Sequence, residues 1–287
     1  MKYAQVLRRY LTSKNMWQVL LLAAAAATGV REERLGGYRV RDPLPSRIYW
    51  LHIPKCGSSF ANTVVHWACD DVALNKSVSA FLGATPIMIV GEKCPRLHKN
   101  HSKHWGRHKD LNRDVVAELG TEKTAVVTML REPHARAESA WNHHHTKGGG
   151  RNIKFTGASS MDAYQFANAT SGCMARTLTG HGTCLHSGPE AKPLLDAALA
   201  RLRDLAFVGI VERWAESICL FHMQFGGNCL DVEFEHLRSQ PHVHKVPYPS
   251  APNVDDTIYA EGKLLFSQAL KKHNVTPENC ARISCRL

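Results

Sequence analysis

The stretch WLHIPKCGSSFANTVVHW, residues 50–67, decides the fold. It opens with apolar residues typical of a buried strand, breaks at Pro54 to Ser59, and continues in a pattern that favours a helix from about Ser59 to Asp70. A turn of this kind, with Lys55 among small residues, can gather backbone N–H groups on an anion at the start of a helix. We therefore expect an anion cradle. Because the lysine precedes the glycine, the pattern is not a Walker A loop.

Two further strand-to-helix units follow this one. The predicted strands are Arg47 to Ile53, Thr124 to Leu130 and Leu205 to Val211, and the predicted helices after the second and third are about His134 to His145 and Arg213 to Phe225. Apolar periodicity predicts further helices over Pro193 to Asp204 and near Asp255 to Lys272. Apolar strands that alternate with helices are typical of a parallel sheet covered on both faces. We predict an α/β fold with a central parallel sheet flanked by helices.

The N-terminal region has the features of a targeting segment. A basic flank precedes the mostly apolar run 16–30, which is short for a spanning helix of about 20 residues. A cleaved signal peptide, an uncleaved signal anchor and a buried helix all fit this run, and the first two place the rest in the secretory lumen. We divide the chain into this segment (1–30), a polar stem (31–46), the main domain (47–272) and a C-terminal tail (273–287).

The glycosylation sequons and cysteines agree with a lumenal compartment. Acceptor triplets begin at Asn75, Asn100, Asn168 and Asn274. The nine cysteines contain no CxxC pair and no zinc-finger spacing, and their odd number leaves at least one outside an intramolecular disulfide. In a lumen some of them should pair. We expect Cys56 to stay unpaired and Cys280 to pair locally with Cys285.

The charge of the chain indicates an anionic partner. The formal net charge is +11, with 17 histidines besides. Residues 92–113 hold seven Lys and Arg against two acidic residues, which is typical of either a solvated face or a track for an acidic glycan. Nucleic acid is disfavoured because no nucleic-acid-binding motif occurs and the leader directs the chain away from it.

The second strand-to-helix unit supplies another cation. Arg131 follows the predicted strand directly, and Ser139 lies eight positions later in the helix, with Arg136 between them. Because the carboxyl ends of parallel strands meet at one edge of a sheet, we expect Arg131 to enter the same crevice as Lys55. There a guanidinium can bind a phosphate in bidentate fashion. The alternative is an Arg in a salt bridge and a Ser that faces solvent.

Taken together, these segments resemble a known enzyme family. HIPKCGSS is similar to the HIPKTGGT-type loop, and LREPHARAESAW to the LRdPveRaiSaY segment, of the membrane-bound carbohydrate sulfotransferases related to heparan-sulfate and chondroitin enzymes. The resemblance continues in family order through CMARTLTG (173–180), FVGIVERWAESICL (207–220) and NVDDTIY (253–259), and spans about residues 48–266. The chain departs from the pattern at Cys56, where Thr is usual, and at Ser58, where the second Gly is usual.

The resemblance implies a P-loop-like three-layer sandwich and a Golgi sulfotransferase with a lumenal catalytic domain, or a secreted form of it. The enzyme would use 3′-phosphoadenylyl sulfate and no metal, and would sulfate a hydroxyl or amine of a glycan or glycoprotein. The residues implied at the 5′ side of the nucleotide are Lys55, Cys56, Gly57, Ser58, Ser59 and Phe60. Arg131 and Ser139 would bind the 3′-phosphate, and Arg176 is a further cofactor-binding candidate. The N-terminal segment would be the contact with the membrane.

The resemblance also implies catalytic roles. Lys55 would stabilise or protonate the oxygen that leaves with the nucleotide. A general base would activate the acceptor, and our first choice is His108, in GRHKDL, with His104 second. The alternatives from other classes are a non-catalytic module that binds acidic glycan on the same fold and a P-loop-like kinase. The acceptor sugar does not follow from the sequence.

Overall fold

The computed structural model describes residues 44–70, 72–78, 94–98, 111, 113–121, 123–146, 161–182, 184, 194–235, 245–246 and 253–287, together with two short strands before residue 40. Those strands, β1 (Arg34–Leu35) and β2 (Tyr38–Arg39), pair antiparallel inside the expected stem. They belong to a unit of residues 1–44, and residues 45–287 form a second compact unit. The apolar run 16–30 lies outside the described residues. Among the helices that are described, none is long and apolar enough to cross a membrane.

The second unit is built on a small parallel sheet. Strands β3 (Arg47–Leu51), β4 (Thr124–Leu130) and β5 (Phe207–Ile210) pair in the order β3-β4-β5, all parallel. Every residue of β4 is buried, as expected for a central strand covered on both faces. The three predicted strands are therefore confirmed, and the fold class is mixed α/β with a three-stranded parallel sheet and helices around it.

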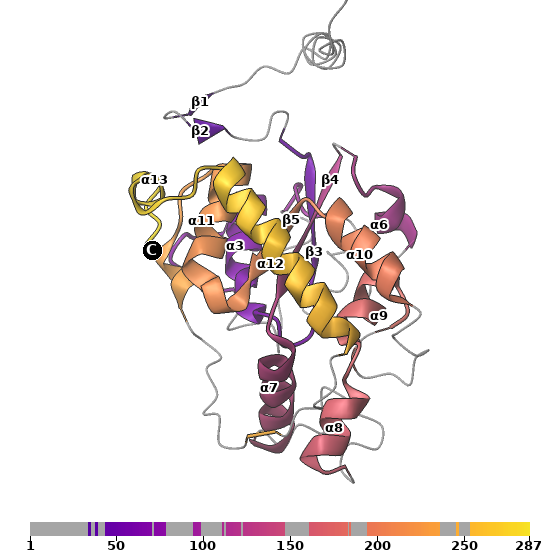
Figure 1. Ribbon diagram of the computed structural model, residues 1–287. Coiled ribbons are helices and arrows are strands. Elements are labelled where there is room, and N and C mark those ends of the chain that lie inside the picture. The colour runs from indigo at the N-terminus through magenta and orange to yellow at the C-terminus, as the bar shows by residue number, and fades with distance from the viewer. Residues whose placement is uncertain are drawn as a thin grey trace, which may run out of the picture. The chain divides into compact units, whose positions relative to one another are not determined.

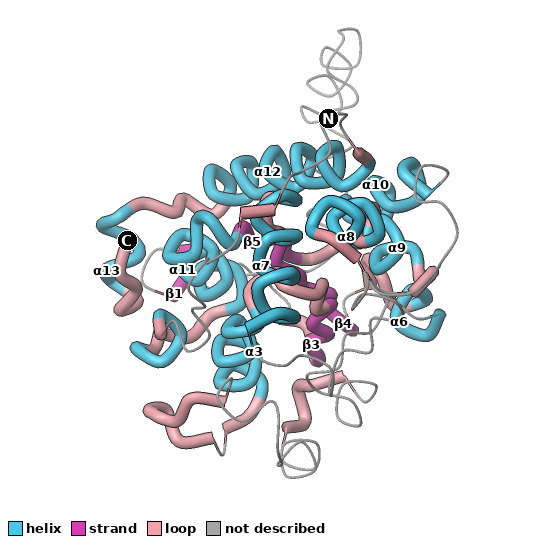
Figure 2. Tube along the Cα trace, turned by 90° about the horizontal axis from the view of Figure 1, so that it is seen from below, coloured by secondary structure: helices cyan, strands magenta, loops and turns pink. Residues whose placement is uncertain are grey.

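One face of the sheet is covered through aromatic side chains. The 3₁₀ turn η1 (Ser58–Phe60) leads into α3 (Ala61–Ala68), and α11 (Trp214–Phe225) packs beside it (Figures 1 and 2). The Phe60 ring stacks on Phe207 of β5 at 5.6 Å and meets Phe221 of α11 edge-on at 5.6 Å. Such pairs add about 0.5–1.5 kcal/mol each beyond their buried area. Phe60, which ends the loop after β3, is thus fixed to strand β5 and to helix α11.

The opposite face is covered by the long helix α12 (Val254–Lys272), which runs across the sheet in Figure 1. A Cβ on Gly262 would lie 2.3 Å from Cδ1 of Leu130 and 3.7 Å from Cγ1 of Val208. A larger residue here would force the Leu130 side chain to move, so Gly262 allows the close approach of α12 to β4 and β5. The helix begins with a capping box of Asn253 and Asp256, which satisfies its first N–H groups.

Other predicted helices are confirmed within two residues of their bounds. They are α7 (Pro133–Thr146) and α10 (Leu195–Asp204), and Pro133 stands at the first position of α7, where its missing N–H costs nothing. Short elements that the sequence analysis did not predict are α6 (Arg113–Ala117), α8 (Ala163–Ala169), α9 (Cys173–Thr179), α13 (Pro277–Arg282), η5 (Val211–Arg213) and η6 (Asp231–Phe234). Helices this short carry little periodic signal.

All nine cysteines lie in the described residues, and eight form disulfides. The pairs are Cys69–Cys94, Cys173–Cys184, Cys219–Cys280 and Cys229–Cys285. The predicted Cys280–Cys285 bond is wrong, because each of these cysteines pairs with α11 or the segment after it. Both bonds therefore tie α13 and the C-terminal residues to the main domain. Cys56 is unpaired, as predicted. Several disulfides are consistent with a secretory or lumenal compartment.

This pairing can be tested by peptide mapping under non-reducing conditions. We expect cross-linked peptides for Cys219–Cys280 and Cys229–Cys285. We also expect one alkylated cysteine, Cys56, which reacts only after unfolding because 1% of its surface is exposed. A Cys280–Cys285 cross-link in the native protein would contradict the structure.

Candidate functional site

The loop after β3 is a tight turn with two residues in the left-handed backbone region. Lys55 has φ 68° and Gly57 has φ 71°. The Cys56 N–H donates to the Ile53 carbonyl at 3.1 Å, and the Phe60 N–H donates to the Gly57 carbonyl at 3.0 Å. A left-handed conformation costs a non-glycine residue about 1–2 kcal/mol. Such backbone strain concentrates at functional sites, where the surrounding structure maintains it.

Gly57 is held against α11. A Cβ at this position would lie 2.8 Å from a Trp214 ring carbon and 3.2 Å from the Val211 side chain. The Trp214 indole N–H is itself fixed by a 2.9 Å bond to the Glu233 carbonyl. Both the positive φ and the lack of space therefore require glycine. The expected small-residue turn is present, and half-buried Ser58 and Ser59 follow it.

Cys56 is a packing residue of this loop. Its side chain is 1% exposed, and burial raises the pKa of its thiol to about 12, although the positive charges of Arg136 and Arg131 partly oppose this. The Arg131 backbone N–H bonds to the sulfur. The thiol is therefore neutral at physiological pH and is not activated as a nucleophile. It fills the position between the first two strand ends.

The ends of β3 and β4 bring two predicted site residues together. Arg131, directly after β4, donates from Nη1 to the Lys55 carbonyl in a long hydrogen bond of 3.5 Å. Both side chains are half-buried. Two cationic side chains thus stand at the same carboxyl edge of the sheet, where parallel α/β proteins bind ligands.

The N-terminus of α7 at this edge is already occupied by the chain itself. The Glu132 carboxylate accepts from the His134 N–H at 3.0 Å and from the Ala135 N–H at 2.6 Å. These are donors that an anion would otherwise use. An anion at this edge would therefore be bound by the side chains of Lys55 and Arg131 rather than by the end of α7.

The other predicted site residues are not all brought to the turn after β3. Ser139 is half-buried on α7, two turns after its start, whereas Phe60 is fully buried and its N–H is used inside the loop. Arg176 lies on α9, 6% exposed, and donates from Nη2 to the Ser171 carbonyl at 2.8 Å. His104 and His108, the proposed bases, lie outside the described residues.

Arg176 belongs to a buried ionic cluster behind the loop. Asp255, at the start of α12, accepts the Met174 and Ala175 N–H groups of α9 at 3.0 and 3.3 Å. Burial raises the pKa of its carboxyl, while Arg136, these N–H groups and Arg176 hold the pKa down. Arg136 is 1% exposed and donates to the Thr170 carbonyl at 2.7 Å. Because the cluster holds two buried guanidinium groups, Arg136 and Arg176, and one carboxylate, Asp255, its positive potential would favour an anion bound nearby.

The end of β5 contributes a second polar junction, which the sequence analysis missed. Glu212 of η5 accepts the Glu132 N–H at 2.9 Å and the Tyr259 hydroxyl of α12 at 2.9 Å. The three residues belong to the quoted segments LREP, GIVER and NVDDTIY. The position of Glu212 directly after a strand, like that of Arg131, was the signal that could have identified it.

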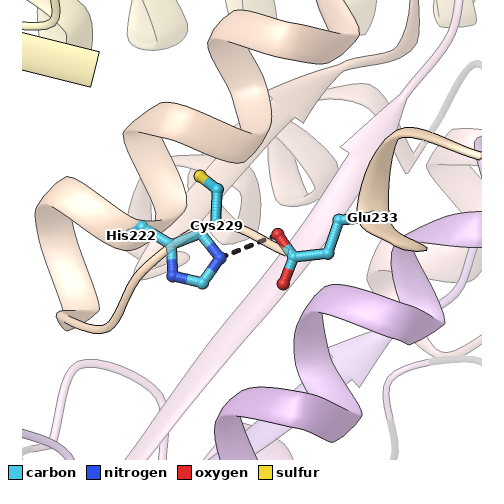
Figure 3. A group of neighbouring side chains, drawn as sticks. All are labelled: His222, Cys229 and Glu233. Carbon is cyan, nitrogen blue, oxygen red and sulfur yellow. Dashed lines mark hydrogen bonds and ion pairs between the residues drawn. The ribbon is translucent and has the colours of Figure 1, made fainter. Parts of the chain in front are cut away.

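Histidine, cysteine and glutamate also meet near the end of α11 (Figure 3). Ligand atoms of His222, Cys229 and Glu233 lie within 4.8 Å of one another, and Nε2 of His222 is 2.8 Å from Oε2 of Glu233. However, the Cys229 sulfur is bonded to Cys285 and cannot act as a thiolate ligand. A histidine and one carboxylate are too few for a zinc site. We interpret the group as a buried hydrogen-bonded pair, His222 and Glu233, that fixes η6 to α11.

Comparison with known protein families and with curated proteins finds no match to this chain.

The contact between Gly57 and Trp214 can be tested by substitution. Gly57→Ala should destabilise the protein by more than the roughly 1–2 kcal/mol of left-handed alanine, because its Cβ would also meet the Trp214 ring. Gly120→Ala is the matched control, since Gly120 has φ 72° but a Cβ added there would meet no atom within 4 Å. Denaturant unfolding measures both variants, and equal losses would contradict the contact.

Proposed function

We propose that this chain is a sulfotransferase of the secretory pathway, with a lumenal, Golgi-type catalytic domain on a P-loop-like sandwich. It transfers a sulfuryl group from 3′-phosphoadenylyl sulfate to a hydroxyl or amine of a glycan. The observation that carries this proposal is the meeting of Lys55 and Arg131 at adjoining strand ends, with Arg131 on the Lys55 carbonyl at 3.5 Å. The order of the family-like segments along the chain supports it.

The nucleotide is bound at two places. Its 5′ side lies at the turn 55–60, where Lys55 offers a charge, and Ser58 and Ser59 offer hydroxyls after the positive-φ Gly57. Its 3′-phosphate is bound by Arg131 and Ser139, since a guanidinium and a hydroxyl can share the oxygens of one phosphate. Arg176 and Arg136 lie behind these groups and add positive potential without direct contact, because both are buried and bonded to carbonyls.

The reaction is an in-line displacement at sulfur. The acceptor oxygen or nitrogen forms a bond to sulfur while the bond between sulfur and the bridging phosphate oxygen breaks, and adenosine 3′,5′-bisphosphate leaves. Such group transfers need alignment and charge stabilisation more than covalent help. Lys55 stabilises the negative charge that develops on the bridging oxygen. A base removes the acceptor proton, and His108, with His104 as second choice, is proposed for it.

The positive charge of the chain supports an acidic glycan as acceptor. The net charge of +11 favours an anionic substrate, and the basic segment 92–113 precedes the second strand.

Other features concern the compartment. The asparagines of three sequons, Asn75, Asn168 and Asn274, are exposed, as glycosylation would require. The chemistry proposed here uses no metal, and the membrane contact is assigned to the N-terminal segment.

Nucleotide selectivity tests the cofactor. The purified lumenal chain should bind adenosine 3′,5′-bisphosphate at least about tenfold more tightly than adenosine 5′-monophosphate, because charge-assisted bonds to the 3′-phosphate contribute about 1.5–3 kcal/mol each. Arg131→Ala should remove most of this preference. Arg203→Ala, which removes an exposed arginine of α10 that pairs with Glu261, should not. Titration calorimetry measures both, and equal affinities of the unaltered chain for the two nucleotides would refute the proposed function.

Turnover tests the role of Lys55. Because its charge acts mainly on the leaving oxygen in the transition state, Lys55→Ala should lower kcat by roughly a hundredfold or more while weakening bisphosphate binding less. His108→Ala should lower kcat and leave nucleotide binding intact. Lys271→Ala, at the exposed end of α12, is the control.

Each outcome of this assay has a separate meaning. Normal turnover by Lys55→Ala would reject the mechanism. Inactivity of His104→Ala alone would move the base from His108 to His104. A chain that binds glycan but transfers no sulfate to a broad acceptor panel would be a binding module.

A further inference from the structure

Glu212 is the one described residue whose carboxylate joins the turn after β4 to helix α12. Its Oε1 accepts the backbone N–H of Glu132 at 2.9 Å, and its Oε2 accepts the Tyr259 hydroxyl at 2.9 Å. Both oxygens are therefore used inside the protein. A charged acceptor forms stronger hydrogen bonds than a neutral one, so this junction is well suited to fix the segments that it joins.

The segment around Glu212 also contacts the turn after β3. Val211 and Trp214, on either side of it, are the residues that leave no room for a Cβ on Gly57. Glu132, which Glu212 holds through the backbone, directly follows Arg131. Arg131 in turn donates to the Lys55 carbonyl. A continuous series of contacts thus connects Glu212, at the end of β5, with Arg131 at the end of β4 and with Lys55 after β3.

The chemistry of its partners explains why a carboxylate is suited to this position. Burial, together with the Glu212 carboxylate, raises the pKa of Tyr259, so its hydroxyl keeps its proton and donates. The Glu132 N–H can only donate. The two donors bond to different oxygens of this side chain, and glutamine has an acceptor oxygen at only one of the two positions.

We propose that Glu212 is a positioning residue that holds the turn of Arg131 against the turn of Lys55, and so sets the affinity for the 3′-phosphate without contacting the nucleotide. The ligand in this statement rests on the proposed function. The geometric part does not, because it concerns only the backbone of Glu132 and the turns that the two hydrogen bonds join.

The test compares Glu212→Ala, Glu212→Gln and Glu216→Ala in the full chain. Glu216 is the matched control, because it is a carboxylate of the same segment that pairs only with Arg213 among the contacts described. Hydrogen exchange read by mass spectrometry reports the Glu132 amide in peptides over 131–135. Calorimetry reports the ratio of affinities for adenosine 3′,5′-bisphosphate and adenosine 5′-monophosphate.

We expect Glu212→Ala to raise exchange at 131–135 by about five- to tenfold, as loss of one hydrogen bond implies. We also expect it to lower the affinity ratio by a similar factor. Glu212→Gln should give intermediate values of both, since its amide oxygen can accept the Glu132 N–H whereas its NH₂ group cannot accept the Tyr259 hydroxyl. Glu216→Ala should change neither. A general loss of stability would lower affinity for both nucleotides, whereas a positioning role changes their ratio.

The outcomes separate this inference from the proposed function. If Glu212→Ala leaves exchange or the ratio at the level of the unaltered chain, the positioning role is rejected. If the unaltered chain shows no preference for the bisphosphate, the proposed function fails, and the ligand part of the inference fails with it, while the exchange data still decide the geometric part. If Glu212→Ala does not fold, Tyr259→Phe decides, because it removes one of the two bonds: a reduced ratio supports the role and an unchanged ratio rejects it.

Discussion

The approach of Trp214 to the backbone of Gly57 is the contact on which the site depends. The turn after β3 contains two left-handed residues in close succession, and an isolated segment would not hold this conformation. Trp214 closes one side of the turn, and its indole N–H is anchored on Glu233. The buried pair of Glu233 with His222 holds that anchor in turn. The conformation of the turn after β3 is therefore maintained by residues far from it in the sequence.

Charge at the carboxyl edge of the sheet is arranged so that the acidic residues are used internally. Glu132 bonds to the first N–H groups of α7, and Glu212 bonds to Glu132 and Tyr259. Their negative charges are thereby compensated by protein donors. The side chains of Lys55 and Arg131 lie at the same edge, beside a neutral thiol. An anion that enters meets positive side chains without competing with an ionised cysteine.

The sheet, the main helices and the cation-bearing turn could be predicted because each has a local cause. Apolar runs such as 124–130 specify buried strands, and a lysine among small residues specifies a turn. The disulfides and the Asp255 cluster could not be predicted, because they depend on which distant segments become neighbours. Cys280 and Cys285 are close in sequence, yet α13 directs them to separate partners on α11 and the segment after it. Local spacing contains no information about that choice.

The two C-terminal disulfides have a consequence for the order in which the bonds of this chain can form. Cys69–Cys94 and Cys173–Cys184 span 25 and 11 residues and can close soon after their segments arrive. Cys219 and Cys229 must wait for partners 61 and 56 residues later. During that interval the thiols of Cys219, in α11, and of Cys229, after it, are unpaired, and α11 is the helix that packs against the turn after β3. In an oxidising compartment, slow oxidation or an isomerase would prevent wrong pairing of these two thiols until Cys285 is available.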